Sequence, residues 1–307
     1  GTLALFCTFG LPCCTWSLLS FATTMSAAEV QVADPQCAPM QSDPRVVQVE
    51  SNSTEMQQRA SATRSTFKRP AVWVMAFGWS LALCAGFVNA VAFRSWGVFV
   101  SHVTGDTTSI GMHIEGYHAG RVDFFPLGLS VAILSSFLCG AFLCGMLIDK
   151  NQVHFGGKSF YGIALVGNAT LLVVSILVPR HQLSACFAAM ACGLQNAMCT
   201  SHFGAIVRTT HVTGTITDIG STTGRMAMIF LRKGFRLSNL NVVERAEVAV
   251  DARKLLVLLP MWLSYLVGTV LGAYLETVFD IYALLLPAFV TLSVGLVYMF
   301  FRQQLKG

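Results

Sequence analysis

The sequence predicts an all-α integral membrane protein with about six transmembrane helices, arranged as an inverted 3+3 repeat with broken or re-entrant HVTG segments. Three observations support this fold class. Of the 307 residues, 54% are hydrophobic and only 11% are charged, whereas soluble domains contain roughly 25% charged residues. The apolar residues gather in runs of about twenty, the length of a helix that crosses a bilayer. The tetrapeptide His-Val-Thr-Gly occurs twice, at 102–105 and 211–214.

Six apolar runs are long enough to span a membrane. They cover residues 71–93, 124–148, 160–178, 183–203, 255–276 and 281–301. If these runs alternate in direction, 17 of the 20 basic residues fall on the side that holds both chain ends. Because cytoplasmic loops retain Lys and Arg, we expect both termini in the cytosol. In an eight-span alternative each HVTG segment also crosses, but this would leave Arg225 inside the bilayer and Lys150 outside, so six spans are preferred.

The segment before the first span is predicted to be a disordered tail, residues 1–70. Its second part, 26–69, is rich in Gln, Ser, Thr, Pro and charged residues and cannot bury a core. Residues 1–24 are mostly apolar, which leaves two alternatives: a signal peptide, although the basic n-region is missing, or a segment that is not native because translation begins at Met25. Most cysteines after the tail lie inside apolar runs, where cysteine behaves as a small hydrophobic residue.

The chain repeats itself, which divides it into halves at 71–182 and 183–302. GFVNA at 86–90 matches GLQNA at 193–197, 107 residues later, and the HVTG copies are 109 residues apart. A weaker match pairs Ala141, Gly145 and Asp149 with Gly268, Gly272 and Glu276. Since each half holds an odd number of spans, the second half must enter the membrane from the opposite side. Such inverted repeats are common in secondary transporters, although an old duplication kept for packing alone is an alternative.

The second half has a longer inner loop, which is predicted to contain a short amphipathic helix at 233–254. Asn241 and Glu244 have capping-box spacing, and the apolar residues that follow fall on one helical face. Basic residues flank this segment, so we expect the helix to lie on the inner leaflet. An ordinary solvated connector is the alternative.

Polar side chains inside apolar runs are candidate ligand-binding groups, because burying them in a membrane is costly. Asn89 and Asn196 occupy equivalent positions in the first and fourth spans. Their amides would either bond to each other across the pseudo-twofold axis or bind a ligand. Gly105 and Gly214 are predicted to break a helix and to expose a new N-terminus, whose free N–H groups would bind an anion or a polar substrate.

Hydroxyl and imidazole groups surround these glycines. The nearest hydroxyls are those of Thr104, Thr107, Thr213 and Thr215. His102 and Asp106 are four residues apart, which places them on one face of a helix, and imidazole titrates near neutral pH. This pair is compatible with a proton relay. In the alternative, His102 and His211 donate to backbone carbonyls that the glycine break leaves free.

The predicted site is for substrate binding, without a metal, a cofactor or catalytic residues. It consists of Asn89, His102, Thr104, Gly105, Asp106, Asn196, His211, Thr213, Gly214 and Thr215. The histidines lack the HExxH or CxxC spacing of metal sites. There is also no GxSxG motif or phosphate-binding glycine loop, so the protein is not predicted to be an enzyme.

The run GVFVSHVTGDTTSIG, with GLQNAMCTSHFGAIVRTTHVTGTITDIG in the second half, resembles the YoaK-like family of uncharacterised multi-pass membrane proteins. The resemblance covers about residues 71–302. It implies a six-helix membrane domain with no settled substrate or activity. The family often has aspartate where this chain has Asn89 and asparagine where it has Asp106, so the carboxylate and the amide have changed places.

The function that the sequence favours is a secondary transporter or permease for a small polar solute. The alternatives are a non-transporting scaffold or sensor and, less favoured, an intramembrane enzyme that uses His102 or His211. The expected partners are the lipid bilayer and a small polar solute or ion; the pattern is compatible with a homo-oligomer and does not indicate nucleic acid. A cavity shared by residues 99–116 and 206–224 would support transport.

Overall fold

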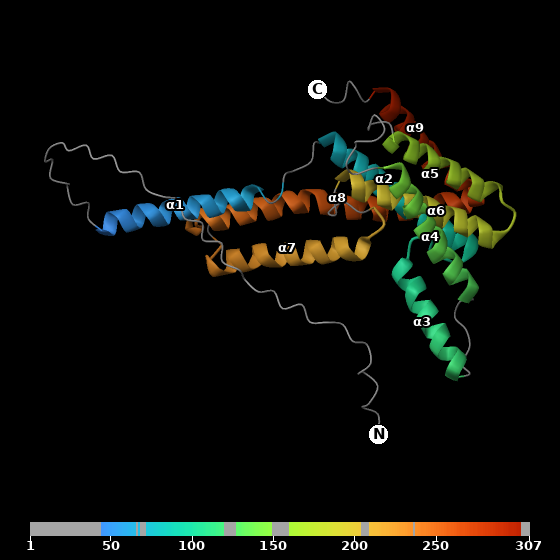
Figure 1. Cartoon of the computed structure of the whole chain (residues 1–307), viewed down its shortest axis with the longest axis horizontal. Coiled ribbons are helices and arrows are strands. Elements are labelled where there is room, and N and C mark those ends of the chain that lie inside the picture. The colour runs from blue at the N-terminus through green and yellow to red at the C-terminus, as the bar shows by residue number, and fades with distance from the viewer. Residues whose placement is uncertain are drawn as a thin grey trace, which may run out of the picture. The chain divides into compact units, whose positions relative to one another are not determined.

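The computed structural model describes residues 44–65, 67, 72–119, 127–148, 160–203, 209–235 and 237–301 (Figure 1). In these residues all regular structure is helical. The helices are α1 (Pro44–Ser65), α2 (Val72–Trp96), α3 (Val103–Ala119), α4 (Leu127–Leu147), α5 (Phe160–Leu177), α6 (His181–Phe203), α7 (Val212–Arg232), η1 (Leu237–Asn239), α8 (Val242–Phe279), η2 (Asp280–Leu284) and α9 (Leu285–Phe301). Residues 48–307 form one compact unit, which contains every site discussed below.

Five stretches of the described residues are long and apolar enough to cross a membrane. They are α2, α4, α5, residues 181–201 of α6, and a stretch at 242–300 that joins α8, η2 and α9. This last stretch covers the predicted run 255–276 and nearly all of the run 281–301, so the described residues of all six predicted runs are almost entirely helical. Large apolar side chains also remain exposed on these helices, among them Leu138 at 67% and Phe289 at 67%. The chain is a helical membrane protein.

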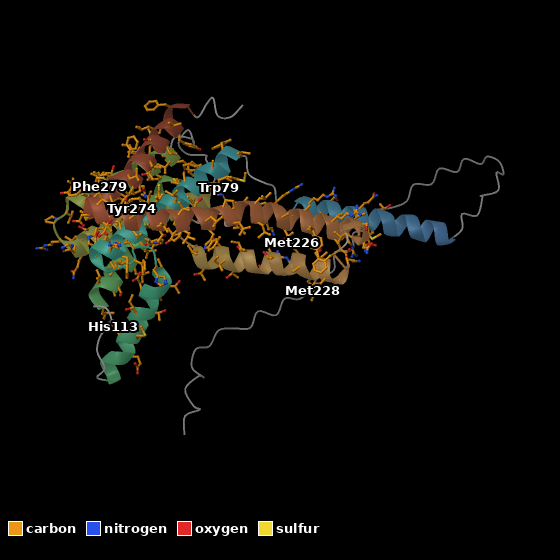
Figure 2. All side chains as sticks on the ribbon, turned by 180° about the vertical axis from the view of Figure 1, so that it is seen from behind. Trp79, His113, Met226, Met228, Tyr274 and Phe279 are labelled. Carbon is orange, nitrogen blue, oxygen red and sulfur yellow. The ribbon has the colours of Figure 1, made fainter. Side chains whose placement is uncertain are left out.

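Two long helix pairs organise the unit: α2 packs along α8, and α4 packs along α6. In the first pair, a Cβ atom at Gly86 would collide with the backbone carbonyl of Tyr265, and one at Gly268 with that of Leu83. The side chains reinforce the contact, because Trp79 of α2 donates its indole N–H to Val257 of α8 over 3.3 Å (Figure 2). Only glycine allows the two backbones to approach this closely.

The second pair repeats these contacts. A Cβ at Gly193 would collide with the carbonyl of Phe137, and one at Gly140 with that of Met190. Positions on α6 follow their α2 counterparts by 107 residues, and positions on α8 follow their α4 counterparts by 128. The two halves of the chain therefore make the same helix–helix contact twice.

The small-residue surface of α4 lies one position earlier in the chain than was predicted. The predicted repeat match paired Ala141 with Gly268. The residue of α4 that approaches its partner helix closely is Gly140, and nothing lies within 4 Å of a Cβ placed at Gly145. Of the two paired acids, Glu276 forms an ion pair of 2.6 Å with Arg94 near the end of α2, whereas Asp149 lies outside the described residues.

The predicted short helix at 233–254 is not a separate element. From Val242 onward these residues form the first part of α8, which continues without interruption through Pro260 to Phe279. The capping box is present, since the backbone N–H of Asn241 donates to the Glu244 carboxylate over 2.8 Å. No glycine or proline interrupts residues 242–259, so the helix has no reason to stop where the charged loop meets the apolar run.

α7 lies alongside this first part of α8 (Figure 1). The Arg225 guanidinium donates to both carboxylate oxygens of Asp251, over 3.2 and 3.0 Å. Near the connection, Lys233 forms an ion pair of 3.2 Å with Glu244. Lys233, one of the basic residues expected at the lipid surface, therefore pairs with α8, and Arg225 holds α7 against it. The Asp251 side chain is only 7% exposed, so its charge requires a partner of this kind.

Part of the predicted disordered tail is helical. Residues 44–65 form α1, in which Arg59 and Glu55 make an i,i+4 ion pair of 2.6 Å. A polar composition excludes a buried core but permits a helix, and this segment has its only proline at the first position, where proline is tolerated. The remaining residues of the tail lie outside the described residues, apart from Phe67.

Candidate functional site

Each HVTG motif forms the start of a helix. α3 begins at Val103 and α7 at Val212, so the motif's histidine stands immediately before the helix in both copies. The first helical hydrogen bonds run from Asp106 N–H to His102 O, 3.1 Å, and from Thr215 N–H to His211 O, 3.2 Å. The three N–H groups between these bonded residues and each histidine have no acceptor within the helix.

The two glycines have a different role from the one predicted. Neither breaks a helix, because the helices begin two residues earlier, and Gly105 and Gly214 lie within the first turn. A Cβ atom at Gly105 would collide with the ring of His102, and one at Gly214 with the ring of His211. The glycines thus let each imidazole lie against the start of its own helix.

The two helix starts meet at one cavity of about 550 Å³. Its lining consists of Asn89, Phe99, Ser101, His102, Val103, Thr104, Phe137, Asn196, Thr210, His211, Val212, Thr213 and Tyr265. Apart from Phe99, these residues form six pairs related by the repeat, such as Thr104 with Thr213 and Phe137 with Tyr265. The cavity is therefore built from equivalent parts of both halves of the chain.

The cavity lies near the middle of the apolar helices. Phe137 has ten residues of α4 before it and ten after it, and Tyr265 lies close to the centre of the predicted span 255–276. Asn89 and Asn196 lie in the second halves of α2 and α6. A helix has 3.6 residues per turn, so Phe137 and Tyr265 lie about three turns from either end of their apolar runs, whereas Asn89 lies about one turn before the end of the run 71–93.

On the first-half side, Asn89 organises the loop that leads into α3. Its Oδ1 accepts hydrogen bonds from the backbone N–H groups of Val100, 3.1 Å, and Ser101, 3.2 Å. Its Nδ2 donates to the Ser101 hydroxyl, 2.5 Å, and to the Tyr265 hydroxyl, 2.7 Å. Asn89 is 5% exposed, and these four bonds use the full hydrogen-bonding capacity expected of a buried amide.

The second-half side is organised differently. Asn196 makes no hydrogen bond to Asn89, and its Oδ1 is buried without a partner among the described residues. The preceding residue, Gln195, contacts the segment before α7 instead. Its Nε2 donates to the Leu81 carbonyl of α2 over 2.8 Å, and it lies 3.4 Å from the hydroxyl of Thr209. The two asparagines are therefore equivalent in position but not in bonding.

Several of the predicted site residues lie outside the cavity lining. Gly105, Asp106, Gly214 and Thr215 are within the first turns of α3 and α7 but do not line the cavity. The Thr215 hydroxyl donates to the His211 carbonyl, 3.1 Å, so it is occupied by the backbone. The Thr107 hydroxyl donates likewise to Val103, 2.8 Å.

The HVTG histidines do not form the carbonyl bonds that were proposed as an alternative. In the described part of the chain neither imidazole makes a hydrogen bond, and His102 contacts the Phe99 ring edge-on at 6.1 Å. One oxygen of Asp106 is buried and without a partner there.

His113 lies farther along α3 (Figure 2), where its ring bonds to the Ser109 carbonyl of the same helix, 2.8 Å. Within the described ranges no three His, Cys, Asp or Glu residues converge as metal ligands.

Three residues that shape the site far from the HVTG motifs were not predicted from the sequence: Tyr265, Phe137 and Gln195. Tyr265 bonds to Asn89, Phe137 is its counterpart beside Asn196, and Gln195 bonds to the carbonyl of α2. An aromatic residue in an apolar run looks like any other membrane-facing residue. The available signal was the comparison of the halves, since glutamine in GLQNA stands where GFVNA has Val88.

The family model described as "Protein of unknown function (DUF1275)" matches residues 77–297. The chain belongs to this family. The matched region includes every cavity residue and both HVTG motifs. It agrees with the resemblance to the YoaK-like proteins, a family to which no function is assigned. No curated protein and no solved structure matches the chain.

Proposed function

We propose that this protein is a secondary transporter or permease for a small polar solute that binds in the cavity between α3 and α7. The observation that carries the proposal is the lining of that cavity. Polar groups from both halves of the chain converge near the middle of apolar helices, around about 550 Å³ of space. Ligand sites in proteins commonly enclose roughly 300–1,000 Å³, so the volume suits a small solute.

The chemistry of the lining favours a solute with hydrogen-bond acceptors. Each helix N-terminus carries about half a positive charge and several N–H groups without helical partners, and two such ends face this cavity. The hydroxyls of Thr104 and Thr213 lie beside them, and no described group accepts a bond from either. The rings of Phe99, Phe137 and Tyr265 complete the lining.

The repeated contacts support an inverted repeat. Each half presents three apolar helices, and the α2–α8 and α4–α6 contacts correspond residue by residue. Inverted repeats provide two conformations of similar energy, in which one half rocks against the other around a central site. The distribution of basic residues supports a topology with both termini in the cytosol.

Transport is tested with purified protein in liposomes and five labelled solutes: glycolate, methoxyacetate, glycine, glycine betaine and glycerol. We expect protein-dependent uptake of at least one of them. The double variant Thr104→Val and Thr213→Val should lower that uptake at least tenfold, because valine keeps the side-chain shape but removes both hydroxyls from the cavity.

A matched control lies one turn along α7. The Thr217 hydroxyl donates to its own helix, to the Thr213 carbonyl over 2.9 Å, and Thr217 does not line the cavity. Thr217→Val should therefore leave uptake within about twofold of the parent protein. Uptake no faster than in protein-free liposomes for all five solutes would refute the transport proposal. The scaffold or sensor alternative would then be favoured.

A further inference from the structure

The two asparagines of the cavity are equivalent by the repeat, yet only one of them is saturated with hydrogen bonds. Asn89 makes four bonds, to Val100, Ser101 and Tyr265. Asn196 has a buried Oδ1 with no partner among the described residues, and its side chain lines the cavity. A buried amide oxygen without a donor is costly in a protein interior. Such an atom needs an explanation.

Two substitutions between the repeats change the surroundings of Asn196. The hydroxyl that Asn89 meets on Tyr265 is missing beside Asn196, because the counterpart of Tyr265 is Phe137. In addition, the Gln195 amide donates toward the Thr209 hydroxyl in the segment before α7, a contact that its counterpart Val88 cannot make. Asn196 therefore has neither the tyrosine hydroxyl nor the loop N–H groups that bond to Asn89.

On the basis of the proposed function, we propose that Asn196 is a specificity-determining residue, whose Oδ1 accepts a hydrogen bond from an O–H or N–H group of the transported solute. The terminal amide turns about a broad torsion, so it can direct this oxygen toward a bound donor. The same solute carries an acceptor group at the helix starts, and their positive ends favour a carboxylate there. The substrate class is a small carboxylate that also bears a hydroxyl or amino group.

A metal cation is the main competing partner for an amide oxygen and nearby hydroxyls. Two helix N-termini face the cavity and would repel it, and the nearby imidazoles of His102 and His211 add no negative charge. Asp106 does not line the cavity. A hydrogen-bond donor on a solute fits this electrostatic environment better than a bare cation does.

The test uses two matched pairs of solutes in the liposome assay. Glycolate and methoxyacetate differ by the hydroxyl donor, and glycine and glycine betaine differ by the N–H donors; all four carry a carboxylate. The parent protein should take up the donor-bearing member of at least one pair tenfold faster than its methylated partner. Asn196→Leu should reduce this ratio to about one.

A second variant tests the same oxygen without removing it. Phe137→Tyr places a hydroxyl where the repeat has that of Tyr265, so the new group should accept a hydrogen bond from Asn196 Nδ2, as Tyr265 does from Asn89, and hold the amide so that its Oδ1 cannot turn toward the solute. We expect the KM for the donor-bearing solute to rise at least fivefold, while thermal unfolding stays close to that of the parent protein. Thr217→Val should change neither value and serves as the control.

The possible results separate this inference from the transport proposal. Equal uptake of both members of each pair, uptake of glycerol alone, or a ratio unchanged in both Asn196→Leu and Phe137→Tyr would overturn the role of Asn196 and leave a permease. Uptake that depends on sodium and does not depend on an O–H or N–H donor of the solute would also overturn the role of Asn196. Absence of uptake for all five solutes would overturn both proposals.

Discussion

Gly86→Val and Gly193→Val are each expected to destabilise the protein strongly, and by similar amounts. At both positions a Cβ would collide with a backbone carbonyl of the facing helix, that of Tyr265 or that of Phe137. A side chain can turn away from such a collision, but a helix backbone must move as a whole. Overpacking a core lowers the free energy of unfolding by about 1–3 kcal/mol. Because these variants must separate two helices, we expect a loss of about 3 kcal/mol or more. Thermal unfolding in detergent, followed by tryptophan fluorescence, measures the effect.

Gly145→Val is the matched control for both variants. Gly145 lies in α4, one of the apolar helices, yet a Cβ there meets nothing within 4 Å. The same substitution should therefore change stability by less than about 1 kcal/mol, the range of ordinary helix propensity. If Gly86→Val destabilised the protein and Gly193→Val did not, the α2–α8 and α4–α6 contacts would not be equivalent. This result would contradict a structural repeat.

The apolar helices were predictable from the sequence because a bilayer imposes a simple requirement. A helix must supply about twenty apolar residues to cross, and this left runs whose limits agree with the observed helices to within a few residues, apart from the start of α8. The repeat was equally visible, since matching residues recur at nearly equal spacings of 107 and 109 residues. The HVTG motifs and the two asparagines could therefore be assigned to one site, and most of them line one cavity.

Hydropathy could not locate the limits of α8. The charges at Asp251, Arg253 and Lys254 end the apolar run, but they do not end a helix, because charged residues are good or tolerable helix formers. The contact face of α4 was also ambiguous. Its glycines at 128, 140 and 145 lie on different faces, and only the position of the partner helix shows that Gly140 makes the contact.

The hydrogen bonds of the site could not be predicted from the sequence either, because they also depend on which helices pack together. A hydrogen bond between Asn89 and Tyr265 joins residues 176 positions apart, and a single sequence has no signal for such a contact. The prediction that each glycine breaks a helix also failed. The residue at which a helix starts depends on the position of the preceding loop. Here the loop residues Val100 and Ser101 are held by hydrogen bonds to Asn89.

Asn89→Leu should be the most damaging substitution within the cavity, because it affects both folding and transport. Leucine has a similar size but offers no acceptor to the N–H groups of Val100 and Ser101 and no donor to the Tyr265 hydroxyl. Each buried group left unpaired costs about 1–3 kcal/mol, so we expect a loss of roughly 4 kcal/mol and a fall in unfolding temperature of about 10 °C. Uptake should fall at least tenfold, because the loop that positions His102 and Thr104 loses its anchor.

Asn89→Asp distinguishes this anchoring role from a general need for size or polarity. A carboxylate still accepts from both backbone N–H groups, and the hydroxyls of Ser101 and Tyr265 can rotate to donate to it. Aspartate should therefore restore most of the stability that leucine removes. Asn196→Leu provides the opposite case, since its Oδ1 holds no loop and the variant should alter solute preference while leaving the unfolding temperature nearly unchanged. Equal destabilisation by leucine at positions 89 and 196 would show that both asparagines are structural, and the cavity would then lack the asymmetry on which solute recognition depends.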